Sequence, residues 1–132
     1  MSEDQERAEK LEARLVDFAG RVIRVANALP PSVSGRHISR QLLRAGTSPA
    51  PNYAEARSAE SRADFIHKLK VVLKELNETC VWFRMIERSG LAPELNLSGE
   101  MDENRQLCRI INASITTSKT RLKRNKRKPK KQ

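Results

Sequence analysis

Apolar residues recur at alternating spacings of three and four along most of this 132-residue chain. This spacing places them on one face of an α-helix and does not match the two-residue period of a half-buried strand. The series in the first segment consists of Leu11, Leu15, Phe18, Val22, Val25 and Leu29. No alternating run favours a strand. The spacing therefore predicts an all-α fold.

Four helical segments are expected from this pattern and its interruptions, at about residues 3–29, 34–58, 61–88 and 101–122. Pro30 and Pro31 end the first segment, and Ser34 is the expected N-cap of the second. Ser61 with Asp64 resembles a capping box at the start of the third. Long helices with short connections favour antiparallel neighbours, so we predict an up-down-up-down four-helix bundle over residues 1–118.

The second segment is interrupted in its middle by the stretch QLLRAGTSPAPNYAEA at residues 41–56. Pro49 and Pro51 each lack a backbone donor, which disrupts the ladder of hydrogen bonds in a helix. We expect one bent helix with its bend after Gly46. The nearby polar side chains that would bind carbonyl groups freed by the bend are those of Thr47, Ser48 and Asn52.

Basic residues are concentrated at the C-terminal end. Residues 119–132 hold nine basic residues and no acidic one: Lys119, Arg121, Lys123, Arg124, Lys126, Arg127, Lys128, Lys130 and Lys131. Without them the chain has 26 − 9 = 17 basic against 16 acidic residues, a net charge of +1 instead of +10. We interpret this segment as a disordered tail that binds the phosphates of RNA or DNA, because phosphate contacts release counterions. The alternative is a solvated end without a partner.

The sequence holds no motif that indicates an enzyme, a metal site or a cofactor. Its two histidines, His37 and His67, have no nearby arrangement of cysteine or serine that suggests a nucleophile, and no Gly-x-Gly spacing suggests a phosphate loop. Asp64 and His67 supply at most one of the several elements that a di-iron bundle needs. Cys80 and Cys108 fall in apolar helical patterns, which favours buried, reduced thiols in a cytoplasmic protein over a disulfide. No run of about 18 apolar residues predicts a membrane span.

Several polar residues lie beside apolar positions of the second and third segments: Asn52, Glu55, Glu75, Glu78 and Thr79. We expect an ion pair between Arg44 and a glutamate of the third segment, and a bond from Asn52 to a nearby backbone group. Such pairs can fix the register of two helices. A functional cluster is the alternative.

The stretch QLLRAGTSPAPNYAEA, followed by SRADFIHKLKVVLKELNET, resembles the four-helix-bundle proteins of the 23S rRNA intervening-sequence family. The matching positions are Gln41, Leu42, Arg44, Ala45, Thr47, Ser48, Asn52, Glu55, Ala56, Asp64, Phe65, Lys68, Leu69, Lys74, Glu75, Glu78 and Thr79. The resemblance covers about residues 15–88. It implies a compact antiparallel bundle that assembles into a ring, often a pentamer, and it carries over no catalytic residue.

The family is similar in fold to the accessory variability determinant proteins of diversity-generating retroelements, which bind nucleic acid and a reverse transcriptase. This likeness and the basic tail predict a non-enzymatic homopentamer that binds RNA or DNA through phosphate contacts, with a reverse transcriptase as a further partner. The alternative is a protein-interaction module in which the apolar face of residues 61–88 docks a partner and the basic tail is incidental.

Overall fold

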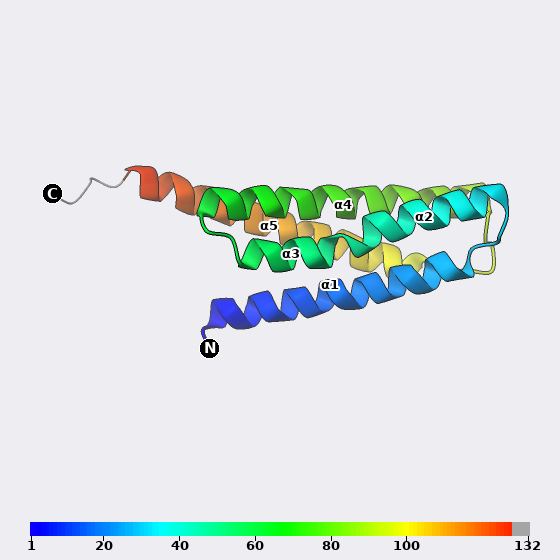
Figure 1. The fold of residues 1–132 in the computed structure, drawn as a ribbon, viewed down its shortest axis with the longest axis horizontal. Helices are drawn as coiled ribbons and strands as arrows, with labels where there is room; N and C mark the ends of the chain where they lie inside the picture. The colour runs from blue at the N-terminus through cyan, green and yellow to red at the C-terminus, as the bar shows by residue number, and fades with distance from the viewer. Residues whose placement is uncertain (128–132) are drawn as a thin grey trace.

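The computed structural model describes residues 1–127, which form five helical elements and contain no strand. The elements are α1 (Glu3–Ala28), α2 (Val33–Thr47), α3 (Pro49–Arg57), α4 (Arg62–Ser89) and α5 (Ser98–Arg127). Because α2 and α3 follow one another along a single row, the five elements fill the four positions of an antiparallel bundle (Figure 1). The predicted all-α four-helix bundle is confirmed. None of these helices is long and apolar enough to cross a membrane.

Serine side chains cap the starts of α1, α2 and α4. The Ser61 hydroxyl accepts a hydrogen bond from the Asp64 backbone N–H at 3.0 Å, so the predicted cap of α4 is present. The N-cap of α2 is Ser32, which accepts from the Gly35 N–H at 3.0 Å. The prediction of Ser34 is therefore wrong, because the extended backbone of Ser32 already places its side chain against the first helical turn.

The second row of the bundle changes direction at Ser48, which separates α2 from α3. The backbone of Ser48 keeps helical dihedral angles (φ −77°, ψ −34°). Pro49 has no N–H to donate to the Ala45 carbonyl, however, and the hydrogen-bond ladder is interrupted there. The prediction of one continuous helix over residues 34–58 is therefore wrong, whereas the bend after Gly46 is confirmed.

The three predicted polar side chains form hydrogen bonds at this bend, but none of them reaches the Ala45 carbonyl that Pro49 leaves without its donor. The Thr47 hydroxyl donates to the Leu43 carbonyl, and the Ser48 hydroxyl donates to the Arg44 carbonyl at 2.5 Å. The Asn52 side-chain amide donates to the carbonyl of Ser48 at 2.9 Å. Each bond reaches back four residues, so these side chains support the turns on both sides of the bend.

The apolar stripes face one core, which is centred on pairs such as Phe18 and Phe83, whose rings meet edge to face with centroids 6.4 Å apart. In the third predicted segment the spacing of three and four runs through Phe65, Leu69, Val72, Leu76, Cys80 and Phe83, and the structure departs from this stripe at two positions. Ile66 and Thr79 are buried, whereas Phe65 and Cys80 are only half-buried. Helix α4 packs against α5 on one side and against α2 and α3 on the other, so its buried face is wide. The centre of this face is displaced around the helix from the predicted stripe.

Helices α1 and α2 approach closely at Gly46, which is buried. A β-carbon built on Gly46 would lie 2.5 Å from Val22 Cγ1 and 3.0 Å from Val22 Cβ. Real β-carbons do not make contacts this short, so the backbone of α2 reaches this position only because residue 46 has no side chain.

Helix α5 begins at Ser98 and continues to Arg127, so the predicted range of about residues 101–122 is too short at both ends. Residues 119–127 belong to this helix, and the predicted disordered tail is wrong for them. Leu122 packs against the core there, and lysine and arginine are good helix formers. The predicted domain boundary at residue 118 consequently falls inside α5.

Candidate nucleic-acid interface

The last part of α5 carries six of the nine predicted phosphate-binding residues. All six side chains are exposed: Lys119, Arg121, Lys123, Arg124, Lys126 and Arg127. Among residues 1–127, none of the six lies within 4.0 Å of a carboxylate. The other three predicted residues, Lys128, Lys130 and Lys131, lie outside the described part of the chain. We call residues 119–127 the basic end of α5.

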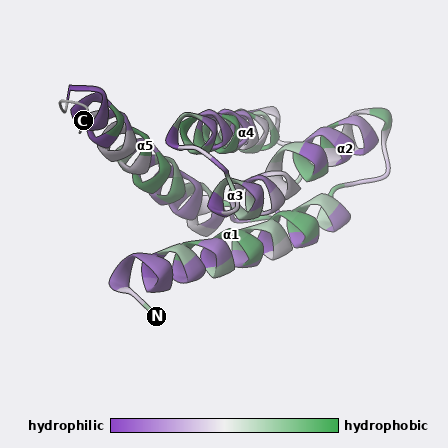
Figure 2. Cartoon of the chain, turned by 60° about the vertical axis from the view of Figure 1, so that its left-hand side comes forward, coloured by the Kyte–Doolittle hydropathy of each residue, from purple (hydrophilic) through white to green (hydrophobic). Residues whose placement is uncertain are grey.

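The spacing of the charges on the basic end is close to that of a nucleic-acid backbone. Nine helical residues span about 13 Å, so six charges give about one per 2 Å. Duplex DNA carries one phosphate per about 1.7 Å of axis. The charges point to most sides of the helix, and only Leu122 turns back to the bundle. Figure 2 shows this stretch as hydrophilic, next to the C-terminus.

The start of α5 is held to α1 by ion pairs. The Arg14 guanidinium donates two hydrogen bonds to the Glu103 carboxylate, at 2.8 and 2.6 Å, and a third to Gln106 at 2.7 Å. The hydrogen bonds that Arg14 donates to the Glu103 carboxylate raise the pKa of Arg14 above its ordinary value. Arg21 lies 3.5 Å from Glu100, one turn nearer the start of α5. These contacts position the helix from which the basic end extends.

The polar motif residues form ion pairs between helices. The Arg44 guanidinium pairs with both Glu75, at 3.4 Å, and Glu78, so the predicted ion pair between the second row and α4 is present. Glu55 of α3 accepts a hydrogen bond from Lys68 of α4 at 2.9 Å, and this bond raises the pKa of Lys68. We interpret these pairs as ties that set the register of α2 and α3 on α4.

The apolar pattern of the sequence does not by itself reveal a buried polar residue of α5. Asn104 has no exposed surface, and within residues 1–127 its side-chain nitrogen has no hydrogen-bond partner. Its oxygen is 3.6 Å from the Cys108 sulfur. The available signal is its position, because Asn104 precedes Leu107 by three residues and so continues the apolar seam.

The structure places both cysteines as free thiols, half-buried instead of fully buried as predicted. Burial, together with the nearby Cys80, raises the pKa of Cys108 to about 11. His37 lies edge-on to Trp82, with ring centroids 6.0 Å apart. No three His, Cys, Asp or Glu side chains in the described chain are placed to hold a metal ion.

The raised pKa of Cys108 predicts slow alkylation. In a Cys80→Ala variant, where burial alone raises the pKa of Cys108, we expect iodoacetamide at pH 8 to modify folded Cys108 about tenfold more slowly than a peptide thiol of pKa 9.0, because the thiolate is the reacting form. Mass spectrometry of timed samples measures the rate. The same variant in urea is the control and is expected to react at the peptide rate, and equal rates in both states would contradict a pKa of about 11.

Comparison with known proteins identifies relatives of most of the chain. The model of a family described as "23S rRNA-intervening sequence protein" matches residues 10–113. The chain is also similar to a crystal structure of a protein of unknown function from the S23 ribosomal protein family of Bacteroides thetaiotaomicron. The two share 28% identity with a TM-score of 0.74, over 83% of this chain and 97% of that one. No curated protein matches the chain. The basic end of α5 lies beyond the residues that the family model matches.

Proposed function

This chain belongs to the 23S rRNA-intervening sequence protein family, and we propose that it is a non-enzymatic, cytoplasmic protein that binds RNA or DNA through the basic end of α5. The observation that carries the proposal is the set of six exposed cations on nine consecutive helical residues, free of carboxylates within the described chain. Contacts to phosphates would relieve their mutual repulsion and release condensed counterions. No aromatic residue lies on the basic end, so these contacts carry no base preference.

The salt dependence of binding tests this function. If about five phosphates are engaged, we expect log Kobs for a labelled RNA or DNA oligonucleotide to fall with log salt concentration at a slope of about −4.5. Fluorescence anisotropy at several salt concentrations measures the slope. Binding that does not depend on salt, or no binding at low salt, would contradict a phosphate-binding role.

We further propose that the protein forms a homo-oligomer, with a ring of five copies as the favoured form. The outer face of α1 supports this proposal. Val16 and Ile23 are 55% and 42% exposed and lie on either side of Gly20, and the exposed Ala13 lies one further turn toward the start of the helix. A β-carbon on Gly20 would meet only the end of a flexible arginine, 3.7 Å away. Since glycine within a helix costs about 1 kcal/mol relative to alanine, close contact with a second copy explains its presence better than packing within one chain does.

Substitutions on this face are expected to dissociate the oligomer. A pentamer has a mass of 5 × 15.0 = 75 kDa, and we expect Val16→Glu with Ile23→Glu to reduce it to 15.0 kDa, since two buried carboxylates would face the partner. Light scattering after gel filtration measures the mass. Val33→Glu is the matched control, because Val33 is 81% exposed outside α1. A wild-type mass of 15.0 kDa would refute the ring, and an unchanged mass of the double variant would refute this interface.

We also propose, as the most specific form of this function, that the protein is the accessory protein of a diversity-generating retroelement and works with a reverse transcriptase. Its support is the similarity in fold between that class and this family, together with the basic end. A reverse transcriptase that co-purifies with the wild-type chain would support this role. If no reverse transcriptase binds the chain, the accessory role is wrong, whereas the proposed binding of nucleic acid is unaffected.

One observation favours a second candidate, a protein-interaction module. Val81 and Met85 lie one turn apart on α4 and are both exposed, so a partner could cover them. The two candidates differ in the role of charge. A docking module would keep its partner after the basic end is neutralised, whereas nucleic-acid binding would be lost.

A further inference from the structure

Helices α1 and α5 diverge toward the end of the bundle that holds both termini (Figures 1 and 2). Between them lies an open groove of about 1030 Å³, whose walls come from α1, α3, α5, the start of α4 and the loop before it. Its apolar lining includes Leu11, Phe65 and Ile110, all only half-buried, and the exposed Ala113. The groove therefore leaves apolar surface uncovered where two neighbouring helices of the bundle fail to meet.

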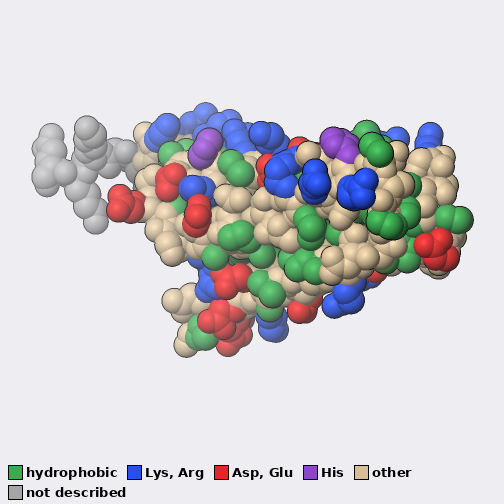
Figure 3. All heavy atoms as spheres, turned by 45° about the vertical axis from the view of Figure 1, so that its right-hand side comes forward, with side chains coloured by type: hydrophobic (Ala, Val, Ile, Leu, Met, Phe, Trp, Pro, Cys, Tyr) green, Lys and Arg blue, Asp and Glu red, His purple; other side chains and the backbone are tan. Residues whose placement is uncertain are grey.

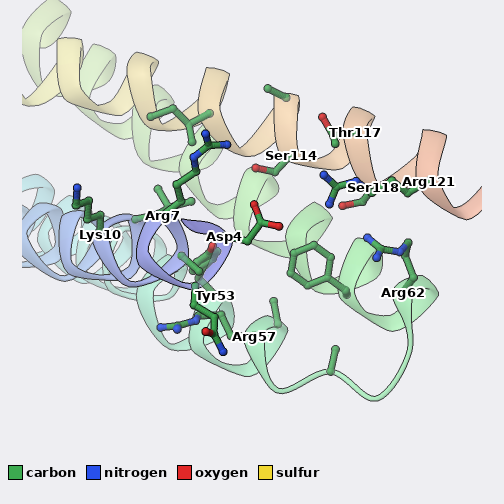
Figure 4. Close-up of a pocket in the computed structure, with 18 of the residues that line it drawn as sticks. Asp4, Arg7, Lys10, Tyr53, Arg57, Arg62, Ser114, Thr117, Ser118 and Arg121 are labelled. Carbon is green, nitrogen blue, oxygen red and sulfur yellow. The ribbon is translucent and has the colours of Figure 1, made fainter. Parts of the chain in front are cut away.

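Most of the charge around this apolar surface is positive. The basic residues that line the groove are Arg7, Lys10, Arg14, Arg57, Arg62 and Arg121, and the acidic ones are Asp4 and Glu60. Arg14 and Arg57 are held by carboxylates of Glu103 and Glu12. Four cations thus face two carboxylates. Figure 4 shows Arg7 reaching from α1 toward α5, and Arg62 and Arg121 at the open end of the groove.

We propose that this groove binds an unpaired stretch of the nucleic acid whose phosphates the basic end of α5 engages. This inference rests on the proposed function and adds to it a preference for single strands. Arg121 lines the groove and also belongs to the basic end, so one strand can leave the groove and continue along α5 without crossing an acidic surface.

The shape of the groove favours a single strand over a duplex. A volume of about 1030 Å³ is at the upper end of pockets that hold drug-sized molecules, and walls on several sides leave no room for a rigid double helix. An unpaired base can place its face on Phe65 and its neighbours, whereas the bases of a duplex are stacked inside it. Tyr53 also lines the groove but is only 6% exposed, so Phe65 provides the accessible ring.

Hydroxyl groups complete a surface suited to phosphates and sugars. Ser114 and Thr117 line the wall that α5 forms, opposite Arg7 of α1 (Figure 4). Ser61, the N-cap of α4, also lines the groove. Side chains of this kind, together with arginine and lysine, make most contacts to nucleic-acid backbones. An acidic helix of a partner protein would use the cations alone and would not need these hydroxyls or the continuity with the basic end.

The test fills the groove without removing a charge. Ala113→Trp places a large side chain in the groove from an exposed position of α5, and Asn112→Trp, one residue away and not in its lining, is the matched control. The probes are an oligouridylate of about twelve nucleotides and an RNA hairpin of equal length. We expect the wild-type chain and Asn112→Trp to bind the oligouridylate about tenfold more tightly than the hairpin. Ala113→Trp is expected to bind the two equally.

The outcomes separate this proposal from the proposed function. If both probes bind with a steep salt dependence but Ala113→Trp changes neither affinity, the groove does not bind nucleic acid. The basic end of α5 then remains the proposed binding site. If neither probe binds at low salt, the proposed function fails first. An oligoglutamate whose binding is weakened by Ala113→Trp, while RNA binding is not, would assign the groove to an acidic protein segment. Arg7→Gln with Arg62→Gln is the second variant, expected to lower only the oligouridylate affinity, about tenfold.

Discussion

Neutralising the basic end of α5 is expected to lower the affinity for an oligonucleotide about a thousandfold at low salt. The variant carries Lys123→Gln, Arg124→Gln, Lys126→Gln and Arg127→Gln. Each phosphate contact that is lost removes about 0.9 from the salt slope, so a slope of about −4.5 would fall to about −0.9. Glutamine forms helices about as well as lysine and arginine, and α5 should keep its length. Anisotropy titrations at several salt concentrations measure both quantities.

The control removes an equal number of charges elsewhere. Basic side chains also gather along the upper edge of the molecule in Figure 3, over α2 and α4. The control variant changes exposed Arg36 and Arg40 of α2, with Arg84 and Arg88 of α4, to glutamine. It has the same net charge as the α5 variant. We expect this control to lower the affinity less than tenfold. If it weakens binding as much as the α5 variant does, binding depends on total charge and the basic end is not its site.

Gly46→Ala is expected to destabilise the fold by roughly 3 kcal/mol, because the new methyl group would overlap Val22 at the closest approach of α1 and α2. Val22 is completely buried and its β-branched side chain has little rotamer freedom, so it cannot move aside. For a domain of this size the melting temperature should fall by about 10 °C. Urea unfolding followed by circular dichroism gives the free energy.

A double substitution identifies the cause of this loss. Val22→Ala alone should cost about 2 kcal/mol through the cavity that it leaves. Combined with Gly46→Ala, the new methyl group fills part of that space, and we expect the double variant to be at least about 1 kcal/mol more stable than the two losses added together. Gly20→Ala in the monomeric Val16→Glu, Ile23→Glu variant is the matched glycine control, since nothing within one chain crowds its β-carbon, and it should not destabilise. If the two losses of stability are additive, the cost of Gly46→Ala does not come from overlap with Val22.

Local patterns in the sequence predicted most of the fold. The spacing of three and four identified every long helix, and Ser61 marked the start of α4. The errors occurred where two local signals competed. Ser32 and Ser34 are both good caps, and only the path of the backbone after Pro31 selects Ser32. The end of α5 was mistaken for a tail because nine like charges outweighed the helical spacing that Leu122 continues.

The candidate site was predictable only in part. The basic end could be recognised because its residues are contiguous in the sequence. The groove could not, because Arg7, Phe65 and Arg121 are far apart in the sequence and meet only through the antiparallel topology. Its existence also depends on how far α1 and α5 diverge, which apolar spacing does not encode. The close contact at Gly46 was hidden for the same reason, since a glycine in a helix does not reveal which neighbour it accommodates.

The ordered turns of the basic end have a cost that depends on the solvent. Lys119 and Lys123 are four residues apart, as are Lys123 and Arg127, and like charges at this spacing disfavour a helix by about 0.2–0.5 kcal/mol per pair. Small ions screen this repulsion, and a bound polyanion removes it. The helix content of residues 119–127 therefore depends on the ionic environment: it rises when anions are abundant and falls when they are scarce. The start of α5, which ion pairs hold to α1, stays helical in both conditions.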